Sequence, residues 1–308
     1  MVNILVLSPH AERYRELIER EQLPEAALNY ACELETALPL AADCEVLFGA
    51  PDLIAAILPE CPALKWAQSS WAGITPLLEC KRRDYRLTGV KDIFGAPMTE
   101  FVLGWLLALE RNIPQRYAAI RWDDSRDGHI AGKTIGIMGT GSIGAHLAAH
   151  CQQLGLTTRG LNSDGRAVAG FDRCWATGER LEFARDLDYL VALLPDTPAT
   201  DRLVDAALLA SLADGAILVN GGRGNSVHTP DLLAALADGR LRHAVLDVLP
   251  EEPLADDDPL WSVERLSITS HTAAPTPGRA IVEVFTGNYR RYLAGEPLHY
   301  EVDFERGY

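Results

Sequence analysis

The sequence predicts an α/β protein with two domains, each organised around a parallel β-sheet that is doubly wound by helices. Short apolar runs alternate with helical patterns along the chain, which is typical of parallel strands joined by crossover helices. One apolar run leads directly into a glycine-rich turn and a helix within residues 133–154. The 308 residues are 48% apolar and 23% charged, so the chain is able to form two ordinary domains that each bury a core.

The first domain opens with an apolar run at residues 2–7, which predicts a buried parallel strand, followed by a polar surface helix at residues 11–22. The next elements predicted are a strand at residues 46–48, a helix at 54–58, a strand at 64–67 and the start of a last strand at 89–90. This domain, residues 1–97, carries no glycine triplet of its own.

A helix at residues 99–112, with Thr99 placed to cap it, is apolar on nearly every side. Such a helix is buried between two bodies, so we expect it to connect the domains. A second domain then occupies residues 98–280. The last helix, residues 279–293, is long enough to return the chain to the first domain, and the tail at residues 298–304 is expected to pack there. The first domain is therefore predicted to be discontinuous, residues 1–97 plus 281–308.

The turn Gly139-Thr140-Gly141-Ser142-Ile143-Gly144 has the spacing of a dinucleotide-binding turn in a Rossmann-type domain. Gly139 allows a tight turn, Gly141 lets a pyrophosphate approach the backbone, and Gly144 lets the helix pack closely on the strand. The free N–H groups of Ser142 and Ile143 at the helix start suit a phosphate. We therefore expect these residues to bind a dinucleotide.

Three chemically active side chains follow three later strands of the second domain. The elements predicted after the turn are strands at residues 156–161, 171–175, 187–194, 216–220, 244–248 and 267–270, and helices at residues 181–185, 199–212 and 230–238. Arg223, Glu252 and His271 each lie in the loop after one of the last three strands. Because ligands of a doubly wound sheet bind outside the carboxyl ends of its strands, we expect these residues at the same edge as the dinucleotide.

Composition excludes several classes of function. A net charge of −15 disfavours binding to nucleic acid or to anionic membranes, because the long-range field repels phosphates. No apolar run reaches the length of a membrane span, and the first residues do not resemble a signal peptide. The six cysteines form no Cys-x-x-Cys pair, which favours a reducing, cytoplasmic location. The histidines show no spacing typical of a metal site, so no metal is expected.

Several motifs together resemble those of the D-isomer-specific 2-hydroxyacid dehydrogenases. They are the glycine turn, Asn220-Gly221-Gly222-Arg223-Gly224, Leu246-Asp247-Val248-Leu249-Pro250-Glu251-Glu252-Pro253, Pro259-Leu260-Trp261 and Ser270-His271-Thr272-Ala273-Ala274. The stretch Asp92-Ile93-Phe94-Gly95-Ala96-Pro97-Met98-Thr99-Glu100 is most similar to bacterial glyoxylate/hydroxypyruvate reductases. The resemblance implies a Rossmann-type cofactor domain inserted into a discontinuous, flavodoxin-like substrate domain.

The resemblance also implies catalytic roles. His271 would be the general acid that protonates the carbonyl oxygen while a hydride reaches the carbon. Glu252 would orient this imidazole and stabilise its protonated form, and Arg223 would hold the substrate carboxylate with its planar fork of donors. Trp71, Ala72 and Gly73 match the family loop whose backbone N–H groups bind that carboxylate. An ordinary turn is the alternative for this loop.

The cofactor site implied by the resemblance includes Asp247, Leu194 and Pro195, although Asp247 is equally suited to capping a turn. NAD-preferring relatives carry an aspartate where this chain has Asn162. That aspartate would repel the 2′-phosphate of NADP, so its absence here allows NADP to bind. Asn162 and Ser163 offer donors to that phosphate, and Arg166 offers a positive charge. We therefore favour NADP over NAD. The two glycines before Arg223 are a second departure, and we expect them to loosen that loop.

These observations predict an NAD(P)-dependent enzyme that reduces a small 2-keto acid, such as glyoxylate or hydroxypyruvate, to the D-2-hydroxy acid. A homodimer is expected, with no nucleic-acid or membrane partner. A short-chain dehydrogenase is excluded, since no tyrosine has a lysine four residues later. Formate dehydrogenases carry glutamine in place of Glu252. The alternative that stays open is a nicotinamide-sensing, corepressor-like protein without significant turnover.

Overall fold

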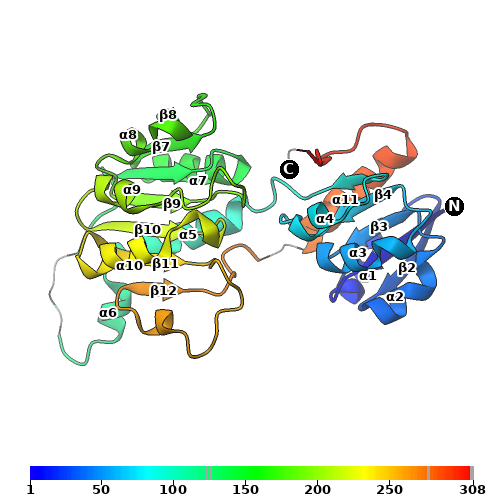
Figure 1. Cartoon of the computed structure of the whole chain (residues 1–308), viewed down its shortest axis with the longest axis horizontal. Coiled ribbons are helices and arrows are strands. Elements are labelled where there is room, and N and C mark those ends of the chain that lie inside the picture. The colour runs from blue at the N-terminus through cyan, green and yellow to red at the C-terminus, as the bar shows by residue number, and fades with distance from the viewer. Residues whose placement is uncertain (123, 125–126, 276–277, 306–308) are drawn as a thin grey trace. The chain divides into compact units, whose positions relative to one another are not determined.

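The computed structural model describes residues 1–122, 124, 127–275 and 278–305, and it divides into two compact units. Unit 1 comprises Met1–Ile93 and Thr276–Tyr308, and unit 2 comprises Phe94–Pro275 (Figure 1). The chain therefore leaves unit 1, completes unit 2 and returns. Both divisions lie a few residues before the boundaries expected from the sequence.

Unit 1 is built on a five-stranded parallel sheet in the order β2-β1-β3-β4-β5. This is the flavodoxin-like order that the resemblance implied. Its strands are β1 (Val2–Leu7), β2 (Ala26–Ala31), β3 (Val46–Gly49), β4 (Trp66–Ser69) and β5 (Arg86–Thr88). Its helices are α1 (Ala11–Arg20), α2 (Leu34–Ala41), α3 (Pro51–Ile57), α4 (Thr75–Glu79) and α11 (Gly278–Leu293), with a short 3₁₀ turn, Leu58–Glu60, after α3.

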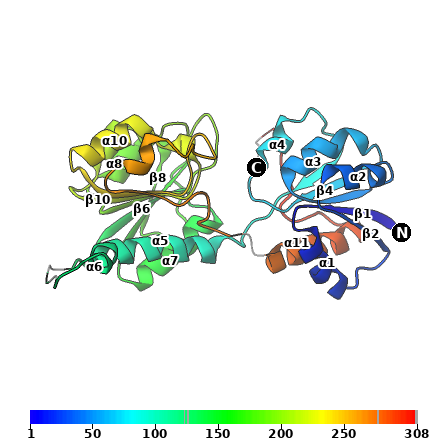
Figure 2. The ribbon, with the colours of Figure 1, turned by 90° about the horizontal axis from the view of Figure 1, so that it is seen from below.

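Helices α1 and α11 lie on one face of this sheet, and α2, α3 and α4 lie on the other (Figure 2). The central strand β3 is buried at all four residues, as a parallel strand covered on both faces must be. Phe48 of β3 and Phe285 of α11 stack with ring centroids 4.4 Å apart, so the returning helix is part of this core.

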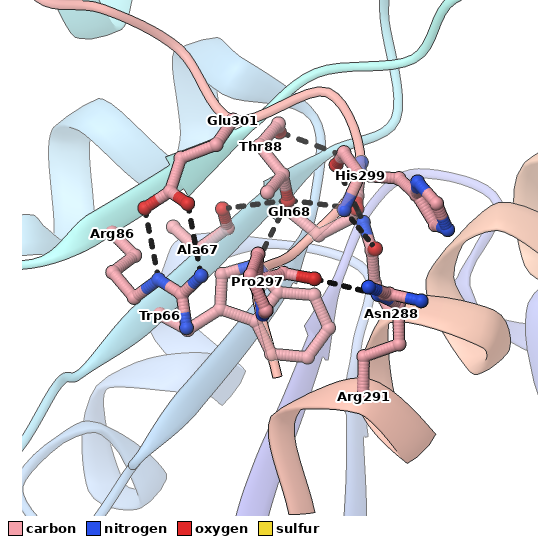
Figure 3. Close-up of polar contacts among 10 residues, drawn as sticks. All are labelled: Trp66, Ala67, Gln68, Arg86, Thr88, Asn288, Arg291, Pro297, His299 and Glu301. Atoms are coloured by element: carbon pink, nitrogen blue, oxygen red, sulfur yellow. Dashed lines mark hydrogen bonds and ion pairs between the residues drawn. The ribbon is translucent and has the colours of Figure 1, made fainter. Parts of the chain in front are cut away.

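The tail after α11 pairs with the edge strand β5, in agreement with the predicted return of the chain. Glu301 forms an antiparallel bridge with Thr88, and the Val302 N–H donates to the carbonyl oxygen of Leu87 at 2.8 Å. Arg86 binds both carboxylate oxygens of Glu301 at 2.8 Å (Figure 3). The tail thereby covers backbone groups of an edge strand that would otherwise be exposed.

Unit 2 is built on a seven-stranded parallel sheet in the order β12-β11-β10-β9-β6-β7-β8, which extends the Rossmann order by one strand. Its strands are β6 (Thr134–Met138), β7 (Thr157–Asn162), β8 (Arg173–Ala176), β9 (Tyr189–Ala192), β10 (Ala216–Asn220), β11 (Leu241–Leu246) and β12 (Leu266–Ile268). Its helices are α5 (Gly95–Glu110), α6 (Ile113–Tyr117), α7 (Ser142–Gln153), α8 (Arg180–Ala184), α9 (Ala206–Ser211) and α10 (Thr229–Ala237), with 3₁₀ turns at Thr177–Glu179, Gly224–Ser226 and Pro259–Ser262.

Helices α5 and α7 lie together on one face of the unit 2 sheet, while α8 and α10 lie on the opposite face (Figure 2). Helix α9 contacts both α8 and α10. The helix predicted at residues 199–212 is wrong in its first half, because the chain turns there and α9 begins only at Ala206. Thr200 accepts from the Thr197 N–H at 3.1 Å and so stabilises that turn, and the Asp205 carboxylate caps α9 by accepting from the Leu208 N–H at 2.9 Å.

A buried carboxylate ties α5 to the amino-terminal edge of the unit 2 sheet. Glu110, 1% exposed, accepts hydrogen bonds from Lys133 Nζ at 2.8 Å and Tyr189 Oη at 2.9 Å, and it also pairs with Arg242. Burial raises the pKa of Glu110, but these partners outweigh that effect and hold the pKa below its ordinary value. The carboxylate is therefore ionised at neutral pH and bound to positive partners.

All six cysteines are free thiols. Within the described ranges, no helix combines the length and apolar character that crossing a membrane requires. Nor does any group of three or more His, Cys, Asp or Glu side chains in those ranges form a potential metal site.

Candidate active site

The loops that carry the three predicted catalytic residues follow neighbouring strands of unit 2. Strand β11 pairs in parallel with β10 on one side and with β12 on the other. Arg223 follows β10, Glu252 follows β11 and His271 follows β12, so all three lie at the carboxyl edge of the sheet. The same edge carries the glycine turn after β6.

His271 and Glu252 are in direct contact. Nδ1 of His271 lies 2.7 Å from Oε2 of Glu252, and the other carboxylate oxygen accepts from the Leu249 N–H at 2.8 Å. Because a carboxylate only accepts, the hydrogen of His271 sits on Nδ1 and Nε2 is left for a substrate. The two side chains are 54% and 35% exposed, so a reactant has access to the imidazole.

The turn that holds His271 is organised by Asp247, which is 3% exposed. Its Oδ1 accepts from Thr269 Oγ1 at 2.6 Å and from the N–H groups of Thr272 at 2.7 Å and Ala273 at 3.0 Å. Its backbone carbonyl accepts from the His271 N–H at 2.6 Å. Asp247 was predicted to contact the cofactor, and the structure gives its carboxylate the turn-capping contacts that were the alternative.

Left-handed backbone conformations at two residues explain why this turn needs such support. Ser270 and His271 have φ values of 54° and 57°, a region that costs a residue other than glycine on the order of 1–3 kcal/mol. Three donors bound to one buried carboxylate offset that cost. The conformation aims the His271 side chain toward Glu252.

Arg223 is half-buried and donates from Nη1 to the carbonyl oxygen of Gly222 at 2.7 Å. Among the described residues its guanidinium forms no ion pair, which leaves it able to bind an anionic group. A Cβ on Gly222 would lie 2.6 Å from the backbone nitrogen of Leu194, and a Cβ on Gly224 would lie 1.9 Å from the carbonyl carbon of Leu249. Gly222 and Gly224 therefore pack this loop against both neighbouring loops, and a Cβ on Gly221 would lie 2.8 Å from Sδ of Met98. Both glycines before Arg223 are closely packed, so the expectation that they loosen the loop is wrong.

Asn220 also positions the arginine loop, a role that was not predicted from the sequence. Its side chain is fully buried, donates to the carbonyl oxygen of Arg223 at 3.1 Å and accepts from the Gly222 N–H at 3.1 Å. A buried amide with both groups used in this way fixes the backbone on either side of the arginine. The available signal was a polar residue that ends an otherwise apolar strand.

A cavity of about 640 Å³ lies beside the His271 and Glu252 pair, within unit 2. Its walls mix apolar and acidic side chains, and Trp261 contributes an exposed indole. The lining residues are Asp247, Leu249, Glu252, Pro253, Leu254, Asp256, Trp261, Ile268, Ser270 and His271. The volume is within the range of small-molecule sites.

The glycine turn fits a dinucleotide phosphate. Gly139 has φ of 101°, and a Cβ on Gly144 would lie 2.0 Å from the carbonyl oxygen of Gly139, so both positions require glycine. A Cβ on Gly141 would meet nothing within 4 Å, which means that its outer side is open. Helix α7 begins directly after Gly141, and its first N–H groups, including those of Ser142 and Ile143, have no acceptor within the helix.

The side chain of Asn162 is used inside the protein rather than offered to a ligand. Its Nδ2 donates to Thr140 Oγ1 at 3.1 Å and to the carbonyl oxygen of Arg166 at 2.9 Å, and its Oδ1 accepts from the Gly165 N–H at 2.6 Å. Both amide hydrogens are therefore engaged, and Asn162 has no spare donor for a phosphate. It shapes the loop that carries Ser163 and Arg166, both exposed.

Arg166 pairs with Asp164 at 3.1 Å, and both side chains are mostly exposed. Such a surface pair is weak and exchangeable. Leu194, the second residue after β9, is buried, and Pro195 is exposed with its carbonyl oxygen bound to Thr200. These residues border the carboxyl edge where β9 ends.

In unit 1, the predicted carboxylate loop follows β4. Ser69 Oγ accepts from the Trp71 N–H at 3.0 Å and donates to the Trp71 carbonyl oxygen at 2.9 Å. The N–H groups of Ala72 and Gly73 have no acceptor in the part of the chain that the structure describes. Trp71 is 43% exposed. The loop thus presents unused backbone donors beside an exposed indole.

A family profile described as "D-isomer specific 2-hydroxyacid dehydrogenase, NAD binding domain" matches residues 103–273, more than half of the chain. The chain belongs to this family. The match lies within unit 2, and it makes the protein an NAD(P)-dependent dehydrogenase.

Known relatives agree with this assignment over most of the chain. Glyoxylate/hydroxypyruvate reductase A of Klebsiella pneumoniae is 33% identical over 217 residues, which are 70% of this chain and 70% of that protein. A D-isomer specific 2-hydroxyacid dehydrogenase family protein from Aeromonas salmonicida has a crystal structure that is 36% identical, with a TM-score of 0.93 over 98% of this chain and 99% of that chain. An NADPH-dependent glyoxylate/hydroxypyruvate reductase from Sinorhizobium meliloti, solved with NADP and sulfate, is 27% identical, with a TM-score of 0.86 over 100% of both chains.

In this dehydrogenase the structure brings Glu252 and His271 into contact and packs the Arg223 loop against the loop of Glu252. The predicted family and fold are confirmed, including the flavodoxin-like order of unit 1. The individual roles of the site residues stay predictions, to which the contacts give a physical basis.

Proposed function

We propose that this dehydrogenase reduces a small 2-keto acid of the glyoxylate or hydroxypyruvate type to the D-2-hydroxy acid, with His271 as general acid. The observation that carries the proposal is the 2.7 Å contact between His271 Nδ1 and Glu252 Oε2, which leaves Nε2 free to give a proton. The reductases from Klebsiella and Sinorhizobium support the substrate class.

Each proposed step uses a group already described. When bound, the reduced nicotinamide supplies a hydride to the carbonyl carbon. His271 gives the proton from Nε2 to the carbonyl oxygen, and Glu252 stabilises the imidazolium before transfer. Arg223 holds the substrate carboxylate and polarises the ketone. The N–H groups of Ala72 and Gly73, next to Trp71, bind a substrate carboxylate oxygen.

We assign substrate binding to residues 1–97 with 281–308 and cofactor binding to residues 98–280. The cofactor contacts would come from Gly139, Gly141, Ser142, Ile143, Gly144, Asn162, Ser163, Arg166, Leu194, Pro195 and Asp247. Of these, Asn162 and Asp247 act in our proposal by holding loops in place, since their side chains are already hydrogen-bonded within the protein.

NADP is the proposed cofactor in preference to NAD. No aspartate stands at position 162 to repel a 2′-phosphate, and Arg166 can exchange its exposed partner Asp164 for that phosphate. The Sinorhizobium reductase contains NADP. Oxidation of NADPH and NADH should be compared by absorbance with glyoxylate, hydroxypyruvate and pyruvate. Efficient turnover with NADH alone would contradict this preference.

The test of the acid role is His271→Ala, with His228→Ala as a matched control. His228 also pairs with a carboxylate, Asp231 at 2.9 Å, but it belongs to α10 and its N-terminal cap. We expect His271→Ala to lower turnover by at least about 10²-fold with unchanged NADPH affinity, since general acid catalysis contributes on that order. Near-normal turnover would refute the role. A nicotinamide-sensing protein would instead bind NADPH tightly and consume no 2-keto acid in its wild-type form.

We also propose that the enzyme is a homodimer, in which a second copy covers an apolar patch on and after α5 and α6. Its members are exposed large side chains: Leu107, Ile113, Tyr117, Ile120 and Trp122. Tyr117 and Trp122 are each 93% exposed, and aromatic residues bury roughly 150–250 Å² each at interfaces. Two copies of such a patch approach the area that a stable dimer needs. Sedimentation analysis should find a dimer that Tyr117→Glu disrupts; a wild-type monomer would contradict it.

The proposed location is the cytoplasm, where reduced thiols persist, and all six cysteines are free.

A further inference from the structure

Gln68 is a fully buried amide and the penultimate residue of strand β4, directly before Ser69, which shapes the predicted carboxylate loop. Parallel strands covered on both faces normally carry apolar side chains, and the neighbouring strand β3 is apolar throughout. Burying an amide costs free energy unless all its groups are hydrogen-bonded. Gln68 is therefore an exception that needs a reason.

Every polar group of Gln68 is paired. Nε2 donates to the carbonyl oxygens of Ser69 at 3.0 Å and Gly89 at 2.8 Å, and Oε1 accepts from Thr88 Oγ1 at 2.8 Å and from Asn288 Nδ2 at 3.0 Å. The contacts reach the carboxyl end of β4, the end of β5 and helix α11 (Figure 3). One side chain thus joins three segments of unit 1.

Asn288 of α11 completes this arrangement and is also fully buried. Besides its bond to Gln68, its Nδ2 donates to the carbonyl oxygen of His299 at 3.0 Å, and its Oδ1 accepts from the His299 N–H at 2.8 Å. Figure 3 shows the amide of Asn288 between Gln68 and the returning tail. Since both of its groups are used, Asn288 holds Gln68 in one orientation.

The contact from Gln68 to the Ser69 carbonyl reaches the loop through one residue. Ser69 Oγ binds both the N–H and the carbonyl oxygen of Trp71, and the Ser70 N–H donates to the carbonyl oxygen of Gly49 at 2.7 Å. The conformation of Ser69 therefore determines where the next amides, those of Ala72 and Gly73, point. These are the donors that lack an acceptor among the described residues.

We propose that Gln68, held by Asn288, is a positioning residue that sets the direction of the carboxylate-binding amides through Ser69. This inference rests on the proposed function of the loop. Binding of a carboxylate by backbone N–H groups requires them to converge on one point, and charge-assisted bonds weaken steeply with misalignment. An apolar side chain at position 68 would fill the core but leave Ser69 without that restraint.

The experiment compares Gln68→Met with Arg86→Met in the full-length protein. Methionine preserves the length of the side chain and removes its hydrogen bonds. Arg86→Met removes the two 2.8 Å bonds to Glu301 that also fasten the tail to β5 (Figure 3). Neither bond involves Ser69. The control therefore loosens the same tail and spares the loop.

We expect Gln68→Met to raise the KM for glyoxylate and the Ki of oxamate, an unreactive analogue, by about tenfold, the cost of roughly one well-aligned charge-assisted bond. The kcat should change less than about threefold and the KM for NADPH should not change, because the substrate carboxylate keeps its charge during the reaction and is bound equally in the ground and transition states. Arg86→Met should leave all four constants at the wild-type values.

Exchange of the Ser70 and Trp71 amide hydrogens, both of which are bonded, provides a readout that does not depend on activity. It should accelerate in Gln68→Met and stay unchanged in Arg86→Met. A folded Gln68→Met variant with wild-type KM and wild-type exchange would overturn the inference. Faster exchange in an enzyme whose wild type reduces no 2-keto acid would uphold the positioning and reject the proposed function.

Thr88→Val is a milder variant for the case that Gln68→Met does not fold. It removes the hydroxyl that donates to Gln68 Oε1 at 2.8 Å and accepts from Trp66 Nε1 at 2.8 Å, while it retains the β-branched shape. Thr88→Val should also raise the KM for glyoxylate, but by less than Gln68→Met. Wild-type KM and exchange in a folded Thr88→Val protein would equally contradict the role of Gln68.

Discussion

Removing the Asp247 carboxylate should misplace His271 more than it weakens cofactor binding. The Oδ1 atom accepts three bonds, from Thr269, Thr272 and Ala273, whereas Oδ2 accepts, among the described residues, from the Ala273 N–H alone, at 3.0 Å. In Asp247→Asn the amide oxygen can keep the three bonds and loses mainly the charge. In Asp247→Ala two backbone donors and a hydroxyl lose their acceptor.

The expected magnitudes follow from these contacts. Loss of charge assistance in Asp247→Asn should cost about 1 kcal/mol of the free energy of unfolding, and loss of all contacts in Asp247→Ala about 3 kcal/mol. For a unit of this size, these costs correspond to decreases in Tm of about 2–4 °C and 6–12 °C. A displacement of His271 by about 1 Å should lower kcat roughly 10²-fold in Asp247→Ala.

The assays are calorimetry, steady-state reduction of glyoxylate, and NADPH binding by fluorescence. Asp231→Ala is the matched control, because this carboxylate also accepts a backbone N–H, that of Ala206 at 2.7 Å, but caps α9 instead of the His271 turn. It should lower Tm and leave kcat unchanged. A folded Asp247→Ala enzyme with kcat within about threefold of wild type would refute the argument. A selective loss of NADPH affinity in Asp247→Asn would favour the direct cofactor contact instead.

Three further predictions concern the glycine turn, the buried carboxylate and cofactor choice. Gly141→Ala should keep the wild-type Tm, because the φ of −70° suits alanine and the added Cβ would meet no protein atom within 4 Å. It should nevertheless weaken NADPH binding at least about tenfold. Gly144→Ala should instead lower Tm, since its Cβ would lie 2.0 Å from the Gly139 carbonyl oxygen. Glu110→Gln should lower the free energy of unfolding by about 2 kcal/mol at pH 7. Because the pKa of Glu110 is lowered in the folded state, the carboxylate stabilises the fold at pH values above the ordinary carboxyl range. This stabilisation is lost as the pH falls through the lowered pKa, so the difference between variant and wild type should vanish in acid. Arg166→Ala should raise the KM for NADPH by about tenfold and leave that for NADH unchanged, as steady-state kinetics would show, whereas equal effects on both would contradict a 2′-phosphate contact.

The edge of the unit 2 sheet was predictable because parallel strands impose it. Once β10, β11 and β12 are recognised as successive parallel strands, the loops of Arg223 and His271 must lie on either side of the loop of Glu252. Hydrophobic pattern and turn residues sufficed for that inference. The length of the last helix predicted the return of the chain to unit 1, and the stacking of Phe285 on Phe48 gives that return its physical reason.

Contacts between distant polar groups were not predictable in this way. The donor role assigned to Asn162 depended on its amide facing a ligand, but that amide binds Thr140 and the Arg166 backbone. The Gln68 and Asn288 pair joins residues 220 positions apart, and no local pattern marks either residue. Strand β2 was not predicted either, because as a half-buried edge strand it lacks a continuous apolar run.

The path of the chain has a consequence for the order in which the protein folds during synthesis. Unit 2 is continuous in sequence and has all of its strands once residue 275 is made, whereas unit 1 still lacks α11 and the partner of β5. Until then the Gln68 amide has no Asn288 and the stacked face of Phe48 has no Phe285. Domains fold as units when their residues become available. Unit 2 can therefore complete its fold before unit 1, although synthesis of unit 1 begins first.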